Sequence, residues 1–144
     1  MVLPPRFVLT TASCSATLST SQSNDIVIAF TIEGLDLQIA CVFTICDTGG
    51  LSWVSRSIDV FGNNGRNQLQ EFYVESPSAL LSDMITESIS GCGTNYNGLM
   101  VFGVSGANFN SPLEPNATLP GSAIGCGKMT SVTISTRDGN DMII

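Results

Sequence analysis

Apolar side chains in this chain either alternate with polar ones or form short continuous runs, and both patterns are typical of β-strands. Residues 15–20 alternate, whereas residues 25–32 are almost continuously apolar, as expected of a central strand. Turn-forming residues separate these segments, most clearly at residues 62–65, which read Gly-Asn-Asn-Gly. The pattern predicts an all-β fold of about nine or ten short strands, arranged as a two-sheet antiparallel sandwich of the jelly-roll or immunoglobulin-like kind.

The other predicted strands share this pattern and lie at residues 37–46, 51–61, 68–74, 84–90, 99–105 and 131–136. A short helical turn is expected at residues 76–81, and residues 107–127 resemble a loop because three prolines interrupt them. We expect residues 1–14 to form an extended N-terminal arm, since Pro4 and Pro5 disfavour regular structure. Residues 15–144 would then form one β-sandwich domain, a suitable size for a single core.

Two windows of the chain resemble each other. Residues 15–28 and 131–144 align without a gap and are identical at seven of fourteen positions. Such self-similarity is a signature of repeated building units. The chain could be one module of an array, could hold two similar strand pairs in one sandwich, or could complete a neighbouring subunit. Each interpretation favours an assembly protein over an enzyme.

Charge and composition exclude several classes of function. Only 12% of the 144 residues are charged, the net charge is −7 and histidine is absent. The five basic residues are scattered, which argues against nucleic acid as a partner, because phosphate binding needs clustered Lys and Arg. No apolar run approaches the length of a membrane span. Without histidine, Ser-His-Asp and Cys-His mechanisms are excluded.

The five cysteines are widely spaced, at Cys14, Cys41, Cys46, Cys92 and Cys126. They form no CxxC pair, so we expect neither a metal nor a cofactor. Two disulfides and one odd thiol are favoured, which implies an oxidising setting. The alternative is that the cysteines are free and act as small core residues. Because Cys41 and Cys46 lie five apart in one predicted strand, they should point to opposite faces and cannot bridge each other.

One short motif resembles the D-T-G signature of aspartic proteases. It consists of Asp47, Thr48 and Gly49, followed by Gly50 and, a few residues later, by Trp53. That chemistry needs two aspartates sharing one proton, so the resemblance implies a homodimer with Asp47 catalytic in each subunit. The simpler interpretation, which we favour, is that the aspartate and the two glycines form a tight turn between strands.

A longer resemblance covers about residues 15–144. Residues 47–56 resemble the D-x-x-G-x-x-[WY]-x-x-R opening of β-sandwich modules found in large bacterial and archaeal surface proteins. Residues 71–74 (EFYV) resemble the E-x-[WY]-x-A strand of those modules, and residues 140–143 (NDMI) resemble their N-D-L-[VI] segment. The resemblance implies a β-sandwich with a role in adhesion or surface architecture.

Three further features bear on partners. The N-terminal arm carries Pro5, Phe7, Val8 and Leu9, an extended apolar stretch that we expect to pair with the sheet of an adjacent subunit. Asn116 begins a glycosylation sequon, which has meaning if the protein is exported. A sugar-binding face could be lined by the aromatic residues Trp53, Phe72, Tyr73, Tyr96 and Phe109.

The sequence therefore predicts a non-enzymatic structural subunit of an extracellular assembly, namely a pilus-like filament, a surface fibre or a virion. Its main partners would be copies of itself, joined by strand exchange, at the cell surface, outside the cell or in a virion. The alternative is a carbohydrate-binding or adhesion module whose partners are glycans. The third hypothesis is a homodimeric aspartic protease that uses Asp47.

Overall fold

The computed structural model describes residues 12–35, 41–62, 67–115, 119–121, 131–137, 139 and 143. These residues contain no helix, and therefore none that is long and apolar enough to cross a membrane. They form seven strands: β1 (Ala12–Leu18), β2 (Asp25–Leu35), β3 (Val42–Asp47), β4 (Val54–Phe61), β5 (Asn67–Ser76), β6 (Asp83–Ser90) and β7 (Thr94–Val104).

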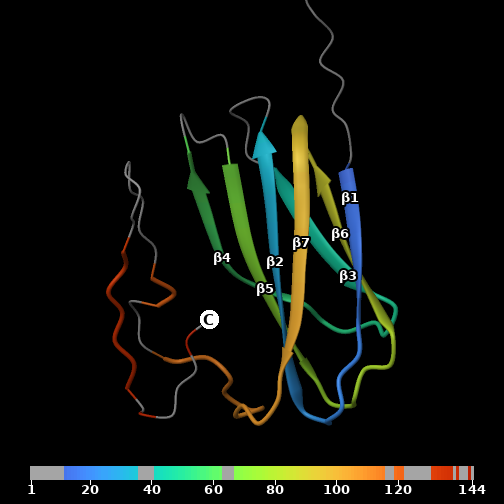
Figure 1. The fold of residues 1–144 in the computed structure, drawn as a ribbon, viewed down its shortest axis with the longest axis vertical. Helices are drawn as coiled ribbons and strands as arrows, with labels where there is room; N and C mark the ends of the chain where they lie inside the picture. The colour runs from blue at the N-terminus through green and yellow to red at the C-terminus, as the bar shows by residue number, and fades with distance from the viewer. Residues whose placement is uncertain are drawn as a thin grey trace, which may run out of the picture.

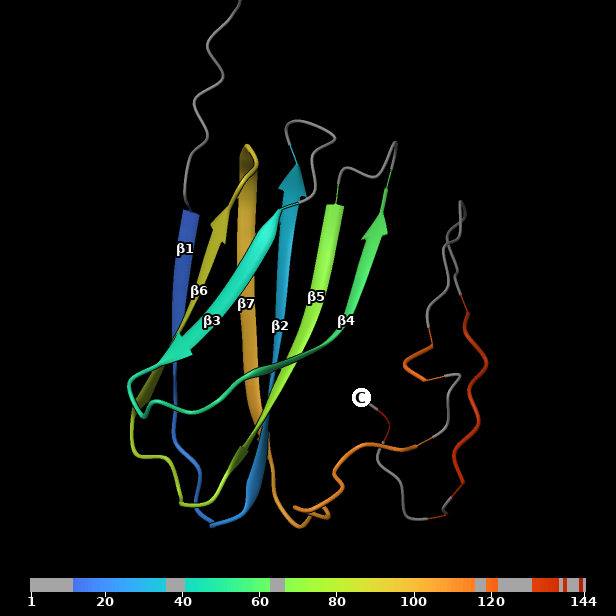
Figure 2. The same cartoon turned by 180° about the vertical axis from the view of Figure 1, so that it is seen from behind.

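The strands form two antiparallel sheets that pack face to face (Figures 1 and 2). The smaller sheet has the order β1-β6-β3 and the larger has the order β4-β5-β2-β7. Of the strands that follow one another in sequence, only β4 and β5 are neighbours within a sheet; every other connection passes from one sheet to the other. The all-β sandwich that the sequence predicted is confirmed.

The central position of β2 explains its apolar sequence. It pairs with β5 on one side and with β7 on the other. Val27 and Ala29 point into the sandwich and are fully buried, while Ile26 and Ile28 point to the outer face and are also buried. A strand covered on both faces reads as a continuous apolar run rather than an alternation, so the prediction for this segment is confirmed.

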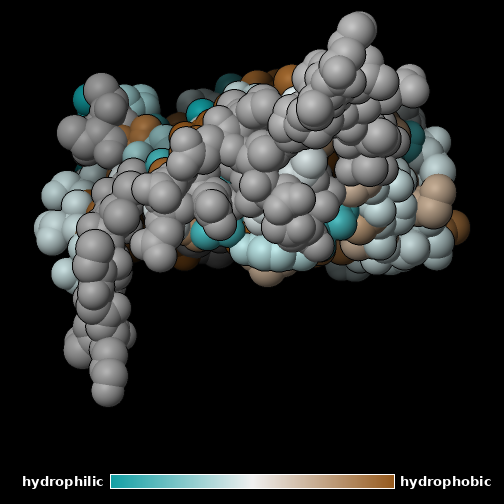
Figure 3. All heavy atoms as spheres, turned by 90° about the horizontal axis from the view of Figure 1, so that it is seen from above, coloured by the Kyte–Doolittle hydropathy of each residue, from teal (hydrophilic) through white to brown (hydrophobic). Residues whose placement is uncertain are grey.

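The core lies between the two sheets. Ile85 and Ile89 of β6 are fully buried and belong to two adjoining clusters, one that includes Val27 and Val74 and one that includes Ala29, Phe43 and Phe72. Buried residues of β6 alternate with exposed or partly exposed ones, as expected of a strand with one face in water. In the view from above, hydrophobic and hydrophilic residues are mixed on the surface wherever described residues are visible (Figure 3).

Several predicted boundaries are wrong. β1 begins at Ala12 rather than at residue 15, because its pairing with β6 extends to Ile89. β7 begins at Thr94 rather than at residue 99. Residues 76–81 form no helical turn, since β5 continues to Ser76 and bends follow. The described strands number seven rather than nine or ten.

The described parts of the two repeated sequence windows differ in structure. Residues 15–28 contain most of β1 and the start of β2, which belong to different sheets. Residues 131–137 form no strand, although the sequence predicted one there, and in both views they lie outside the two sheets, beyond β4. Val132 is 50% exposed. Alternation alone does not form a strand without a neighbour that accepts its hydrogen bonds.

Candidate functional site

The Asp47 carboxylate closes the turn between β3 and β4. Both of its oxygens lie 3.1 Å from the backbone N–H of Leu51, and Oδ2 accepts a hydrogen bond of 2.7 Å from the indole Nε1 of Trp53. Gly50 has a φ of 73°, a conformation that favours glycine. The tight turn that the sequence predicted is therefore present, with Asp47 as its acceptor.

The rest of the motif fastens this turn to β6. Asp83 Oδ1 accepts hydrogen bonds from the Thr48 hydroxyl and from the Gly49 N–H, the second at 3.0 Å. The Thr48 hydroxyl oxygen in turn accepts the N–H of Met84 at 3.0 Å. Asp47, Thr48 and Gly49 thus each make contacts within the subunit that stabilise the turn.

Four of the five aromatic residues predicted for a sugar-binding face do not lie on one face. Phe72 is buried between the sheets, and Trp53 packs against the core while its indole N–H is engaged by Asp47. Tyr73 lies on the opposite face of β5 from Phe72, since consecutive strand residues alternate. Tyr96 is 54% exposed, and its hydroxyl donates a hydrogen bond to Asn67. These four side chains do not form a common platform.

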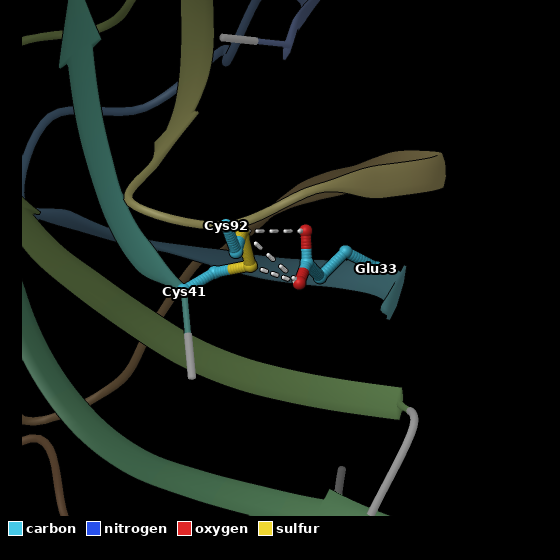
Figure 4. A group of neighbouring side chains, drawn as sticks. All are labelled: Glu33, Cys41 and Cys92. Carbon is cyan, nitrogen blue, oxygen red and sulfur yellow. Dashed lines mark hydrogen bonds between the residues drawn. A yellow bond between two sulfur atoms is a disulfide. The ribbon is translucent and has the colours of Figure 1, made fainter. Parts of the chain in front are cut away.

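A cluster of cysteines and carboxyl groups lies inside the opposite end of the sandwich from the Asp47 turn. We call it the sulfur–carboxyl cluster; it consists of Cys14, Glu33, Cys41, Glu87 and Cys92. Cys41 and Cys92 form a disulfide with a Cα–Cα distance of 5.1 Å. Glu33 reaches from β2 with its carboxyl group toward both sulfur atoms (Figure 4). Glu33, Cys92 and Glu87 are fully buried.

The protonation of Glu33 follows from its surroundings. Its Oε1 contacts Cys41 Sγ, and Oε1 and Oε2 lie 3.6 and 3.7 Å from Cys92 Sγ. Disulfide sulfur atoms carry no hydrogen and cannot donate to a carboxylate. Burial, reinforced by the nearby charge of Glu87, raises the pKa of Glu33 to about 7. The carboxyl group is therefore held partly neutral near pH 7.

Glu87 pairs with the thiol of Cys14 from the neighbouring strand β1. Cys14 Sγ donates to Glu87 Oε2 at 2.7 Å, whereas Glu87 Oε1 has no hydrogen-bond partner. Burial raises the pKa of Glu87, and the hydrogen bond from Cys14 opposes this only partly. Burial and the contact with Glu87 raise the pKa of the Cys14 thiol to about 12. Cys14 is thus a protonated hydrogen-bond donor and not a reactive thiolate.

Gln68 of β5 fixes the backbone at Cys41. Its Oε1 accepts the Cys41 N–H at 3.1 Å, and its Nε2 donates to the Cys41 carbonyl at 3.2 Å. Gln68 is only 1% exposed, so water does not compete for these bonds. The position of Cys41 relative to β2 and β5 is therefore set by a buried side chain.

The sequence-based predictions for cysteine meet with mixed outcomes. The Cys41–Cys92 bond confirms that a disulfide is present. Cys41 is buried and Cys46 is exposed on the other face, so the prediction that these two do not bridge is confirmed. Cys14 and Cys46 are free thiols, which leaves one disulfide among the described cysteines rather than two. Cys126 lies outside the described residues.

The four apolar positions of the predicted intersubunit strand, Pro5, Phe7, Val8 and Leu9, also lie outside the described residues, as does Asn116. The role of Glu33 was not predicted, because the expected strand ended one residue earlier. A signal was present: Val27, Ala29, Thr31 and Glu33 follow the strand period of two, which places Glu33 on the inward face.

The larger sheet ends in β4, which pairs only with β5 among the described strands. Ile58 and Val60 lie opposite the buried Gln70 and Gln68, yet they are 55% and 46% exposed. The smaller sheet therefore leaves this part of the larger sheet uncovered. Val54, at the start of the strand, is 46% exposed. Val54 pairs with Tyr73 and therefore lies on the opposite face of β4 from Ile58 and Val60. We call Ile58 and Val60 the β4 edge surface.

Two local features shape this edge. A bulge between Ser55 and Ser57 interrupts the pairing of β4 with β5, and Arg56 forms an ion pair of 2.8 Å with the buried Glu71. After the bulge, residues 57–61 pair regularly with β5. A depression of 370 Å³ lies beside the start of the strand and is lined by Gly50, Leu51, Ser52, Val54, Tyr73, Val74 and Glu75.

No protein-family model, curated protein or solved structure that was compared with this chain matches it.

Proposed function

We propose that this protein is a non-enzymatic structural subunit of an extracellular assembly such as a surface fibre, a pilus-like filament or a virion. The observation that carries this proposal is the β4 edge surface. An edge strand presents backbone N–H and C=O groups to a partner, and proteins usually protect such edges with charges or prolines. Here the regular part of the edge combines those groups with Ile58 and Val60, both about half exposed, and the exposed Asp59 between them is its one charged residue.

The energetics favour a contact that combines strand pairing with apolar burial. Full burial of a Val or Ile side chain contributes about 1.5–3 kcal/mol, so each half-exposed side chain of the β4 edge surface offers roughly 1 kcal/mol. Two such side chains alone do not offset the entropy lost on association, which is at least about 4 kcal/mol. Backbone hydrogen bonds along the edge, repeated at each subunit contact, would supply the remainder.

Two other properties support an extracellular structural role. The Cys41–Cys92 disulfide suits an oxidising environment. The chain has few charged residues, and Ser, Thr and Asn supply much of its polarity, which lowers the desolvation cost of close packing between subunits. The Asp47 carboxylate is already occupied by Leu51 and Trp53, which fits a structural role for the turn.

Sedimentation velocity and electron microscopy of the oxidised protein test this proposal. We expect concentration-dependent oligomers or fibres that Ile58→Lys reduces strongly, because a charge would be buried at the contact. Met84→Lys is the matched control: Met84 is 47% exposed, but it lies on β6, the central strand of the smaller sheet. A parent protein that remains monomeric at its solubility limit, or equal assembly by Ile58→Lys and the parent, would contradict the proposal.

Strand exchange by the N-terminal arm stays a separate prediction. Deletion of residues 1–11 should weaken assembly while leaving the thermal unfolding of the domain nearly unchanged. If the deletion variant assembles as the parent does, the contact does not use this segment, and the β4 edge surface alone would have to account for association.

A further inference from the structure

Three metal-ligating side chains of the sulfur–carboxyl cluster meet at one point. The ligand atoms of Glu33, Cys41 and Cys92 all lie within 4.8 Å of one another, and all three residues are buried. They come from three different parts of the fold: β2, the residue before β3, and the connection between β6 and β7. Folding therefore brings together ligands whose spacing in the sequence does not indicate a metal site.

Among the described residues, no positively charged side chain pairs with Glu33 at this point. The two arginines that the structure describes are engaged elsewhere, Arg56 with Glu71 and Arg137 with Glu114. In the oxidised protein, Glu33 faces sulfur atoms that cannot donate a hydrogen bond. A buried carboxylate is costly unless it is protonated, paired or bound to a metal. Reduction of the disulfide would add two thiols to this site.

We propose that, once the Cys41–Cys92 disulfide is reduced, Glu33, Cys41 and Cys92 bind a divalent transition-metal ion of the zinc class. A dithiol reductant breaks the S–S bond: it delivers two electrons and two protons to the cysteines and is itself oxidised to a disulfide. The metal ion then displaces both thiol protons to solvent and forms two metal–thiolate bonds. Thiolate ligands favour zinc-like ions over calcium or magnesium.

The local geometry suits such an ion. With Zn–S bonds of about 2.3 Å, two sulfur atoms of a tetrahedral site lie ~3.8 Å apart. The two sulfur atoms, which are bonded to each other in the oxidised protein, must therefore separate after reduction, while Glu33 already lies beside both. Gln68 makes hydrogen bonds with both the N–H and the carbonyl of Cys41, so the backbone that carries this ligand is already positioned. Three protein ligands leave the fourth tetrahedral position for water or another small group.

The disulfide and the metal site exclude each other because they use the same sulfur atoms. The reduced chain would bind metal, and the oxidised chain would not. A metal ion bound before oxidation would also protect Cys41 and Cys92 from pairing with Cys14 or Cys46. The site therefore distinguishes the reduced protein from the oxidised protein, a property independent of the proposed assembly function.

Cobalt(II) is the probe for this proposal. The full chain is reduced with a dithiol, freed of reductant under anaerobic conditions, shown to be folded by circular dichroism, and titrated with Co²⁺. We expect one ion per chain, a thiolate-to-cobalt charge-transfer band and the visible bands of tetrahedral Co²⁺, all lost on addition of Zn²⁺. The oxidised parent, which contains the same residues, should show none of these signals.

Variants separate this site from binding by the other thiols. Cys92→Ser should lose the charge-transfer band of a two-thiolate site, whereas Cys46→Ser, which changes an exposed free thiol, should keep it. Glu33→Gln should weaken Co²⁺ binding by more than about tenfold, since removal of even an indirect supporting group of a metal site costs that much. The proposal is overturned if the reduced parent, folded or not, binds no Co²⁺. It is also overturned if Cys46→Ser loses the charge-transfer band as Cys92→Ser does, or if Glu33→Gln binds Co²⁺ with unchanged affinity.

Discussion

The hydrogen bond between Asp47 and Trp53 offers a direct test of how the turn between β3 and β4 is stabilised. Asp47→Ala removes the acceptor for the indole N–H and for the backbone N–H of Leu51. Trp53→Phe removes the indole donor and keeps an aromatic ring against the core. Comparing both single variants with the double variant isolates the interaction between the two side chains.

The expected magnitude follows from the geometry. A hydrogen bond to a charged group contributes about 1.5–3 kcal/mol, and partial exposure of Asp47 places this one toward the lower end. We therefore expect Asp47→Ala to lower the free energy of unfolding by about 2 kcal/mol, with a coupling energy to Trp53 of about 1–2 kcal/mol. Asp47→Asn keeps one acceptor oxygen and should lose only about half as much.

Urea denaturation followed by far-ultraviolet circular dichroism provides the assay. This signal is needed because Trp53 is the only tryptophan, and its replacement removes the fluorescence probe. A coupling energy below about 0.5 kcal/mol, the usual limit of additivity between independent sites, would refute the reasoning. Peptidase activity in the parent that Asp47→Asn abolishes would instead favour the aspartic-protease hypothesis.

Three other predictions concern the interior. Burial raises the folded-state pKa of Glu87 above its ordinary 4.5, so the folded state binds more protons than the unfolded state, and wild-type stability should fall as pH rises above about 4.5. Glu87→Gln should therefore stabilise the oxidised protein at pH 7 but not at pH 4. Equal effects of this variant at both pH values in urea titrations would contradict the prediction. Ile85→Ala should cost about 3 kcal/mol, because Ile85 is fully buried; a loss below about 1 kcal/mol in denaturant titrations would contradict its place in the core. Reducing Cys41–Cys92, which are 51 residues apart, should lower the unfolding free energy by up to about 4 kcal/mol, and unchanged urea midpoints with and without reductant would refute that estimate.

The sequence predicted those parts of the fold that are determined by local interactions and by burial. β2 was predictable because burial on both faces requires an apolar run, and the turn at Asp47 was predictable because Asp and Gly suit tight turns. The boundaries of β1 and β7 were not, since they depend on how far a partner strand continues. Residues 131–136 alternate like a strand, but no described strand pairs with them.

The sulfur–carboxyl cluster was beyond sequence reasoning for a similar reason. Glu33, Cys41 and Cys92 meet only because the strand order brings the ends of β2, β3 and β6 together. A glutamate at the end of an apolar strand is normally expected to point into solvent. Its inward direction follows from the strand period, but the identity of its neighbours follows from topology alone.

Nearly every connection passes from one sheet to the other, and this topology affects the kinetics of folding. β1 pairs with β6, so Cys14 meets a glutamate 73 positions later, and only the β4–β5 hairpin forms from adjacent segments. Such a high contact order slows folding, because chain closure must precede most of the stabilising contacts. During synthesis β1 stays without its partner until β6 has emerged. This interval is when its backbone is most open to pairing with another chain.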